Sequence, residues 1–420
     1  MPLGLHGRVF YGWWIVAAGF GLEVLIGILV FHVYGAYVVL LRHEFGWSKT
    51  MLSAAFALAR AESGLLGPLQ GWLTDRFGPR ALIQVGMVVF GVGYLLLSQV
   101  NSPVTFFLAF FVIALGSSLG GYLPTGVALV NWFRRRRATA LAIASSGMPV
   151  GGLLTPLVVS ALEHFGWRWT AFVSGLVILV AGVPLGRVVR HRPEPYGEWP
   201  DGEPLAPSTL ATRPTGSTVA VVEFTAREAM RTPAFWLISL GHGSALLVVS
   251  AVMVHLLPYV TERLGYSLQE GARVVALMAV VQVGAQLLGG GWAGDRFSKR
   301  ALVVACMAMH AAALLLLAFA TRFWMVAAFG VLHGVAWGIR GPLMSGIRAD
   351  YFGRAAFGTI SGFSSLIVML GMMGGPLVAG ILADRTGSYR PGFVILAMLA
   401  GLGSVFFLLA RRPIGPRPTS

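Results

Sequence analysis

A ten-residue stretch that occurs twice in this chain limits the folds available to it. Residues 71–80 read GWLTDRFGPR, and residues 291–300 read GWAGDRFSKR, 220 positions later in a chain of 420 residues. Six of the ten positions are identical. Another landmark keeps this spacing to within one residue, since Gly46-Trp47-Ser48 corresponds to Gly265-Tyr266-Ser267. A long repeat of this kind indicates two copies of one structural unit.

Both copies are strongly apolar. Hydrophobic residues make up 56% of the chain, charged residues make up only 11%, and the mean hydropathy is +0.76. A typical soluble domain has about 25% charged residues. Apolar runs of about 20 residues, the length that crosses a bilayer as a helix, recur from end to end. We therefore predict an all-α integral membrane protein.

Twelve transmembrane helices are predicted, six in each copy. They lie near residues 11–41, 51–74, 80–99, 104–131, 138–163, 168–189, 234–260, 271–293, 300–320, 323–348, 356–383 and 391–410. The stretch between the copies is rich in Pro, Gly, Ser and Thr, a composition typical of a flexible linker. Within it, Thr225 and Glu228 have the spacing of a capping box, which predicts a short surface helix. The predicted domains are a six-helix bundle at 1–190, a cytoplasmic linker at 191–233 and a six-helix bundle at 234–420.

The net charge of +15 is explained by orientation in a membrane rather than by nucleic-acid binding. With the N-terminus inside the cell, most of the 31 lysine and arginine residues fall on the cytoplasmic side, which is the positive-inside bias. The run of arginines at 134–137 is then an anchor near anionic lipid headgroups. We predict a multi-pass protein of the cell membrane with both termini cytoplasmic.

The pattern G-x-L-x-D-R-x-G-x-R resembles the signature loop between the second and third helices of the major facilitator superfamily. The first copy matches every fixed position, whereas the second has Ala293 for Leu and Ser298 for Gly. Helix number and repeat agree as well, so the resemblance covers essentially the whole chain. It implies two six-helix bundles that rock about a central substrate site. We expect the protein to work as a monomer.

Other segments are similar to those of the monocarboxylate and oxalate/formate transporters. Trp132-Phe133 followed by a basic cluster resembles the fifth-helix pattern of this group, and Phe45-Gly46-Trp47-Ser48 and the segment 350–354 resemble its bacterial members. In that group the arginine that binds the carboxylate usually lies deep in the eighth helix, where this chain has Gln286. Arg273 lies near the outer end of the same segment. Another cation must therefore take this role if the substrate is a carboxylate.

Ionisable side chains inside the predicted spans are the main functional candidates, because a charge within a bilayer is costly unless it is paired or neutral. Arg340 is the only cation deep in the apolar spans of the second copy. His333, Trp337 and Arg340 are spaced i, i+4 and i+7, which places them on one helical face. We predict that these three residues contact substrate. The sequence leaves the role of Arg60, in the second segment, open.

The superfamily resemblance adds further candidates. Its first, fourth, seventh and tenth helices line the cavity, which places Glu23, Tyr122 and His242 there with Arg340. Tyr122 and His242 are predicted to bind substrate. Glu23 and Glu62 are the candidates to carry a coupled proton, and the sequence does not rank them. A static Glu–Arg pair that only fixes helix register is the structural alternative.

The signature loop is expected to control conformation. In the superfamily this turn makes charge contacts between helices that open and close with the transport cycle. The resemblance carries this gating role to Asp75, Arg76 and Arg80. The alternative is a turn whose basic residues only follow the positive-inside bias.

These observations predict a secondary active transporter that moves a small organic anion of monocarboxylate type by alternating access and is coupled to protons. The alternative is a proton-driven exporter of an apolar or cationic compound, because the stretch 147–152 resembles the antiporter pattern of the fifth helix. A receptor or membrane enzyme is a third class. The sequence contains no metal-ligand cluster, nucleotide loop or nucleophile–base arrangement of the kind enzymes need. No metal or other cofactor is expected.

Overall fold

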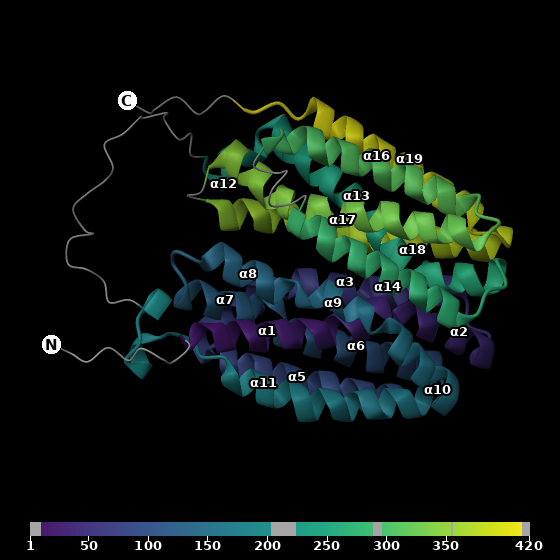
Figure 1. The fold of residues 1–420 in the computed structure, drawn as a ribbon, viewed down its shortest axis with the longest axis horizontal. Helices are drawn as coiled ribbons and strands as arrows, with labels where there is room; N and C mark the ends of the chain where they lie inside the picture. Colours follow the sequence, from purple (N-terminus) through teal and green to yellow (C-terminus); the bar gives the residue numbers. More distant parts are fainter. Residues whose placement is uncertain (1–9, 203–223, 289–295, 354–355, 414–420) are drawn as a thin grey trace. The chain divides into compact units, whose positions relative to one another are not determined.

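The structure is a computed structural model that describes residues 10–202, 224–288, 296–353 and 356–413. Every regular element in these ranges is a helix (Figure 1). Ten of the described helical stretches are long and apolar enough to cross a membrane. The predicted all-α membrane fold is therefore confirmed.

The first half of the chain contains eleven numbered α-helices, two of which continue through π-helical turns. They are α1 (Gly12–Ile26), α2 (Tyr34–Phe45), α3 (Lys49–Leu65), α4 (Gly67–Phe77), α5 (Pro79–Leu97), α6 (Pro103–Gly120), α7 (Tyr122–Trp132), α8 (Arg137–Ser145), α9 (Gly147–Leu153), α10 (Thr155–Val177) and α11 (Val183–Val188). The π-helical turns are Gly27–His32 after α1 and Ile178–Gly182 after α10.

The second half is built from longer and more continuous helices. They are α12 (Ala226–Met230), α13 (Pro233–Pro258), α14 (Leu268–Ala285), α16 (Lys299–Ala318), α17 (Phe323–Phe352), α18 (Phe357–Thr386) and α19 (Arg390–Leu409), with a π-helical turn at Tyr259–Arg263.

Four predicted segments are interrupted rather than continuous. The segment 51–74 breaks at Leu66 between α3 and α4, and the segment 138–163 breaks at Ser146 and Leu154. The segment 11–41 is interrupted at Val33, and the segment 104–131 at Gly121 between α6 and α7. Glycine and proline are frequent around these breaks, and both weaken a helix interior, glycine through its backbone freedom and proline through its missing N–H. All the predicted segments except 51–74 and 138–163 correspond to the ten stretches long enough to cross a membrane. The stretch from Thr155 to Val188 is bent at Gly166, where φ of 78° is not helical, so its first part belongs to the predicted segment 138–163.

The short surface helix expected in the linker is present as α12. The backbone N–H of Glu228 donates to the Thr225 hydroxyl at 3.3 Å, and the Glu228 carboxylate accepts from the Thr225 backbone N–H at 2.8 Å. The Thr225 hydroxyl also donates to that carboxylate at 2.7 Å. These hydrogen bonds, the backbone one first, hold the pKa of Glu228 below its ordinary value, because they favour the charged form. The predicted capping box is thereby confirmed.

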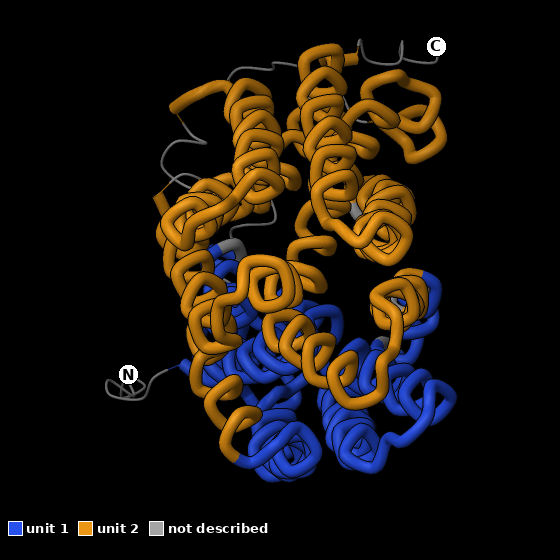
Figure 2. The backbone as a smooth tube through the Cα atoms, turned by 90° about the vertical axis from the view of Figure 1, so that its right-hand side faces the viewer, with its two compact units in different colours: residues 1–30, 65–151, 165–217 blue, residues 31–64, 152–164, 218–420 orange. Residues whose placement is uncertain are grey.

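The chain divides into two compact units (Figure 2). Unit 1 consists of residues 1–30, 65–151 and 165–217, and unit 2 of residues 31–64, 152–164 and 218–420. In unit 1, α5 packs along α6, and α1 packs against α7, α8 and α11. In unit 2, α13 packs against α18, α16 lies between α17 and α19, and α2 packs on α13. Unit 2 thus joins helices of the second half to α2 and most of α3.

Glycines set the close approach of helices within each unit. In unit 1, a Cβ on Gly86 of α5 would lie 2.4 Å from the backbone nitrogen of Gly120 on α6. In unit 2, a Cβ on Gly375 of α18 would lie only 1.9 Å from the carbonyl oxygen of Leu247 on α13. Small residues at helix crossings of this kind let backbones pack directly in membranes.

We expect Gly375→Ala to lower the thermal stability of the detergent-purified protein, because the new methyl group would overlap the α13 backbone. Overpacking of this kind typically costs about 1–3 kcal/mol. Gly362→Ala is the matched control in the same helix, since no heavy atom lies within 4 Å of its added Cβ. A thermal melt in which the two variants behave alike would show that this crossing is not tightly packed.

Candidate functional site

Arg340 is the most deeply buried arginine that the structure describes. It lies in the middle of α17 in unit 2, and only 1% of its surface is exposed. Its Nε and Nη1 atoms have no hydrogen-bond partner among the described residues. No ion pair joins it to a carboxylate in the described parts of the chain. A guanidinium keeps its charge at all physiological pH values, so it is suited to receive an anion.

Polar side chains on three helices of unit 2 lie within electrostatic range of Arg340. Its charge acts electrostatically on Cys306 and His310 of α16, on His333 of α17 and on His242 of α13. These neighbours are a thiol and imidazoles, which can accept or donate hydrogen bonds but do not neutralise a guanidinium. The described environment of Arg340 therefore retains positive charge.

The predicted binding residues His333 and Trp337 are brought together with a residue that was not predicted to bind substrate, His310. The rings of His333 and Trp337 lie 6.0 Å apart between centroids. The Nδ1 atoms of His333 and His310 are 3.1 Å apart, and both side chains are fully buried. One Nδ1 must donate and the other accept, so two neutral imidazoles pair as opposite tautomers. Their Nε2 atoms have no hydrogen-bond partner among the described residues.

His242, another predicted binding residue, belongs to a buried polar network. Its Nδ1 accepts a hydrogen bond of 2.8 Å from Nη2 of Arg348. The same Arg348 nitrogen donates to the hydroxyl of Ser364 at 2.8 Å, and Ser239 donates to Ser364 at 2.9 Å. Because arginine can only donate, Nδ1 of His242 carries no proton in this arrangement.

Arg348 was missed at the sequence level because the tenth segment was predicted to end there. The helix α17 continues to Phe352, and Arg348 is only 7% exposed. The available signal was its spacing of eight residues from Arg340, which places it about 80° around the helix and thus within the broad face formed by positions i, i+4 and i+8.

Glu23 and Tyr122 come together in unit 1. Glu23 lies in α1 and is 6% exposed, and its charge acts on Tyr122 at the start of α7. A Cβ on Gly147 would lie 2.9 Å from the Glu23 Cβ, so the start of α9 packs directly on this residue. The Glu23 carboxylate makes no hydrogen bond or ion pair to another described residue. The Tyr122 side chain is 52% exposed, as expected of a residue that faces a cavity or lipid.

Glu62 and Arg60 lie close together on α3 in unit 2. Glu62 is 5% exposed, and its charge acts on Arg60. The Arg60 guanidinium lies over the rings of Phe31 and Phe56, at 4.6 and 5.1 Å from their centroids. Cation–π contacts of this kind stabilise a desolvated guanidinium by around 2 kcal/mol. Glu62 therefore has a cation within electrostatic range, whereas Glu23 has none among the described residues.

The gating prediction concerns side chains of which only part is described. The side chain of Asp75 and the second copy of the loop up to Asp295 lie outside the described residues. Arg76 and Arg80 are exposed. The Arg76 guanidinium lies over the Trp72 ring at 5.2 Å, so this cation packs on the loop's own tryptophan. The gating role stays a prediction.

A further set of charges was not predicted, and we name it the helix-end network. It consists of Arg42, Lys49, Thr50, Glu262 and Asp384, all in unit 2. Glu262 forms ion pairs with Arg42 and, at 3.2 Å, with Lys49. Asp384 accepts hydrogen bonds from the backbone N–H groups of Lys49 and Thr50, at 3.2 and 2.7 Å, and from the Thr50 hydroxyl at 2.7 Å. A carboxylate from the end of α18 thus caps the start of α3.

A buried histidine connects the same helices. Nε2 of His255 lies 3.0 Å from the Ser53 hydroxyl and 2.9 Å from the carbonyl oxygen of Pro376. A carbonyl can only accept, so Nε2 carries the proton. Nδ1 of His255 faces the Tyr389 hydroxyl at 3.4 Å. The neutral imidazole is fully partnered here, which fits a structural role that joins α3 to α13 and α18.

A family model described as the Major Facilitator Superfamily matches residues 19–292 and 238–420. Among relatives, the membrane sensor protein UhpC of Salmonella typhimurium is 25% identical over 90% of this chain and 89% of its own length. Monocarboxylate transporter 11 of Homo sapiens is 26% identical over 95% of this chain and 82% of its own length. A fujikurins efflux protein of Gibberella fujikuroi is 31% identical, over 34% of this chain and 31% of that protein.

The fold has a counterpart among solved structures. The inward-facing and occupied crystal structure of a bacterial homolog to the human lysosomal transporter Spinster superposes with a TM-score of 0.72. The match covers 98% of this chain and 100% of that one, at 17% sequence identity. At this level of identity the likeness concerns the fold alone.

Proposed function

The chain belongs to the Major Facilitator Superfamily of secondary transporters, and we propose that its substrate is a small organic anion of monocarboxylate type. Family membership makes it a multi-pass membrane transporter rather than an enzyme. Its relatives include a monocarboxylate transporter, a membrane sensor and an efflux protein, so the substrate class must be argued from this chain's own residues.

The observation that carries the proposal is the buried guanidinium of Arg340. It is in the centre of a membrane-spanning helix and has no carboxylate partner among the described residues. A carboxylate can accept two parallel hydrogen bonds from one guanidinium, which satisfies the unpartnered nitrogens and neutralises the charge together. Arg340 would thus take the place of the eighth-helix arginine that this chain lacks, with His333, Trp337, His242 and Tyr122 as proposed further contacts.

Coupling to protons is proposed for Glu23 or Glu62, because a buried carboxylate can neutralise its charge by binding a proton. The transport cycle would be an alternating-access movement of the two sequence halves, 1–190 and 234–420, about the site, with both termini cytoplasmic. An exporter of an apolar or cationic compound is the second candidate. The glycine-rich start of α9 and the partial likeness to an efflux protein favour it.

Uptake by purified protein in liposomes tests the substrate class. We expect radiolabelled lactate, pyruvate, formate or oxalate to enter faster when the outside is acidic than when no pH gradient is present. A lipophilic cation is the comparison substrate. Accumulation of none of the acids, together with proton-driven movement of the cation, would replace this proposal by the exporter.

The helix-end network predicts how the protein changes conformation. In the predicted orientation it lies on the outer side, where α2 and α3 must separate from the second half for the outside to open. We expect Glu262→Gln combined with Asp384→Asn to favour the open state. The double variant loses exposed ion pairs worth about 0–1 kcal/mol each and hydrogen bonds to a carboxylate worth about 1.5–3 kcal/mol. We therefore expect the equilibrium between closed and open states to shift at least several-fold toward the open state.

Labelling of a single cysteine measures this shift. Ser53 is completely buried beside His255, so Ser53→Cys in a Cys306→Ser background reports opening to a membrane-impermeant maleimide. The rate of maleimide labelling of Ser53→Cys should rise several-fold when Glu262→Gln and Asp384→Asn neutralise the carboxylates of the helix-end network. Arg385→Cys, exposed at the same helix end, should label at the same rate with and without the network. If Ser53→Cys stays equally protected in both backgrounds, the network does not hold this side closed.

A further inference from the structure

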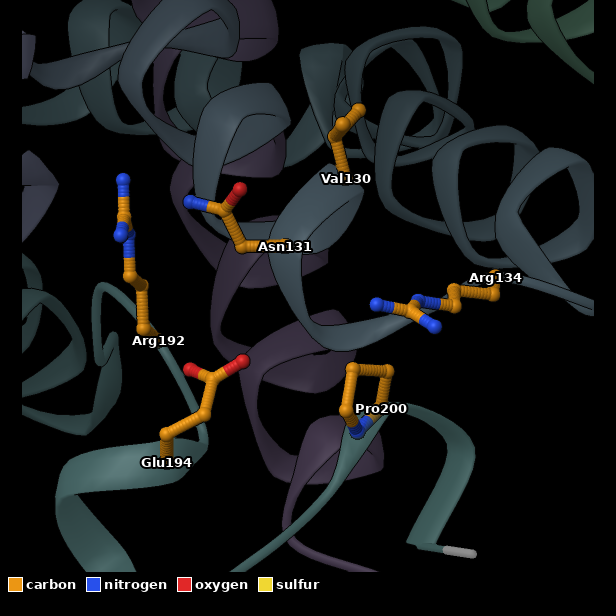
Figure 3. A pocket seen from close by; sticks show the side chains of 6 residues that line it. All are labelled: Val130, Asn131, Arg134, Arg192, Glu194 and Pro200. Atoms are coloured by element: carbon orange, nitrogen blue, oxygen red, sulfur yellow. The ribbon is translucent and has the colours of Figure 1, made fainter. Parts of the chain in front are cut away.

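A cavity of about 280 Å³ in unit 1 is lined by charged side chains that the transport proposal does not use (Figure 3). Its lining residues are Val130, Asn131, Arg134, Arg192, Glu194 and Pro200. The cavity lies where α7 ends at Trp132 and where the chain continues after α11 ends at Val188. Because both helices end stretches that are long and apolar enough to cross a membrane, we place the cavity at the level of a membrane surface.

The two sides of the cavity are joined by hydrogen bonds. The Asn131 side-chain amide donates to the His191 carbonyl oxygen at 3.1 Å, and the Trp132 indole N–H donates to the Arg190 carbonyl oxygen at 2.9 Å. The Arg190 guanidinium lies 3.7 Å from the centroid of the Tyr11 ring. The segment after α11 is therefore held against the end of α7.

Asp201 fixes the backbone of the arginine run. It adopts φ of 62°, an unfavourable conformation for a residue with a side chain, and its Oδ2 accepts the backbone N–H groups of Arg134 at 2.9 Å and Arg135 at 2.8 Å. Partial burial raises its pKa, but these hydrogen bonds outweigh burial and hold the pKa below the ordinary value. The ionised carboxylate binds backbone only, which leaves the Arg134 side chain available to the cavity.

Three charged side chains face this cavity without pairing to one another. In Figure 3 the Arg134 guanidinium points toward Asn131 and Glu194, and Arg192 lies on the opposite side. In the described part of the chain, no hydrogen bond or ion pair engages the side chains of Arg134, Arg192 or Glu194. The cavity thus presents two cations, one carboxylate and an amide.

We propose that this cavity binds the headgroup of a zwitterionic aminophospholipid, with its phosphate on Arg134 and Arg192 and its ammonium on Glu194. Guanidinium groups match phosphate oxygens in geometry and charge. The carboxylate would oppose a purely anionic ligand but pairs with an ammonium. Tyr196 and Trp199, which lie between the lining residues Glu194 and Pro200 in the sequence, are 46% and 44% exposed, and such aromatic side chains favour the headgroup region. The position of the cavity at the membrane surface and its combination of two cations with one carboxylate together favour a lipid over a free phosphate ion.

Titration of the detergent-purified full-length protein with short-chain phosphatidylethanolamine, phosphatidylglycerol and inorganic phosphate tests the proposal, with bound ligand counted by native mass spectrometry. We expect phosphatidylethanolamine to bind most tightly. Arg134→Gln combined with Arg192→Gln should weaken it by about tenfold or more, since charge-assisted hydrogen bonds are lost. Arg227→Gln, which removes an exposed arginine on α12, should leave binding unchanged.

Glu194→Lys separates headgroup recognition from general attraction to anions. It should reverse the preference, so that phosphatidylglycerol binds more tightly than phosphatidylethanolamine. Equal binding of inorganic phosphate and phosphatidylethanolamine to the unmodified protein would overturn the headgroup assignment. The assignment would also be overturned if Arg134→Gln combined with Arg192→Gln bound the lipid as tightly as the unmodified protein and had the same thermal melt. Because binding is measured without transport, these outcomes do not depend on the substrate proposed above.

Discussion

Arg340→Lys is expected to abolish uptake of an organic anion while the protein remains folded and inserted in the membrane. Lysine keeps the positive charge but loses the planar arrangement of N–H groups that holds both carboxylate oxygens. Removing one partner of a buried, hydrogen-bonded charge pair typically costs about 2–5 kcal/mol. We therefore expect uptake, measured as kcat/KM in proteoliposomes, to fall by at least about 30-fold.

The control for this experiment lies on the same helix. Arg322 is exposed at the start of α17, and Arg322→Lys should leave uptake unchanged. Size-exclusion profiles and thermal melts of both variants establish that they are folded. If Arg340→Ala binds and transports the anion as well as the unmodified protein does, the organic-anion proposal fails and the exporter becomes the better hypothesis.

The architecture could be predicted from sequence because its determinants are local or periodic. The repeat at 71–80 and 291–300 predicted two related halves, and runs of apolar residues located the spans. Thr225 and Glu228 predicted the start of α12, because a capping box is formed by residues within one turn. None of these inferences required knowledge of which helices touch.

The candidate site could be predicted only in part, for a physical reason. Burial of Arg340 followed from its place in an apolar segment. The hydrogen-bond partners of His242 and His333 could not be predicted from the sequence. Arg348 lies 106 positions from His242, and His310 comes from a neighbouring helix. Such pairs depend on how helices rotate and cross, which one sequence does not specify. The cap that Asp384 provides for α3 spans more than 300 positions and was missed for the same reason.

The structure also changes how the two carboxylates compare. The sequence left Glu23 and Glu62 as equal candidates for the coupled proton. A neighbouring cation favours the ionised form of a carboxylate, whereas burial among apolar groups favours the neutral form. Glu62 has Arg60 beside it, and Glu23 has no charged partner among the described residues. Glu23 is therefore the better candidate to take up and release a proton, and Glu62 the better candidate to stay ionised within electrostatic range of Arg60.

Glu23→Gln should accordingly remove the drive from a pH gradient while exchange of internal for external anion continues. Glutamine imitates the protonated carboxyl group in size and polarity but cannot release a proton, so accumulation should fall to the level seen without a gradient. Glu62→Gln should retain pH-driven accumulation and instead lower thermal stability, because Arg60 loses a neighbouring charge. Glu163→Gln, at an exposed position, is the control that should affect neither measurement. Loss of pH drive in Glu62→Gln with full drive in Glu23→Gln would reverse the assignment, because it would place the proton on the carboxylate that has a cation beside it.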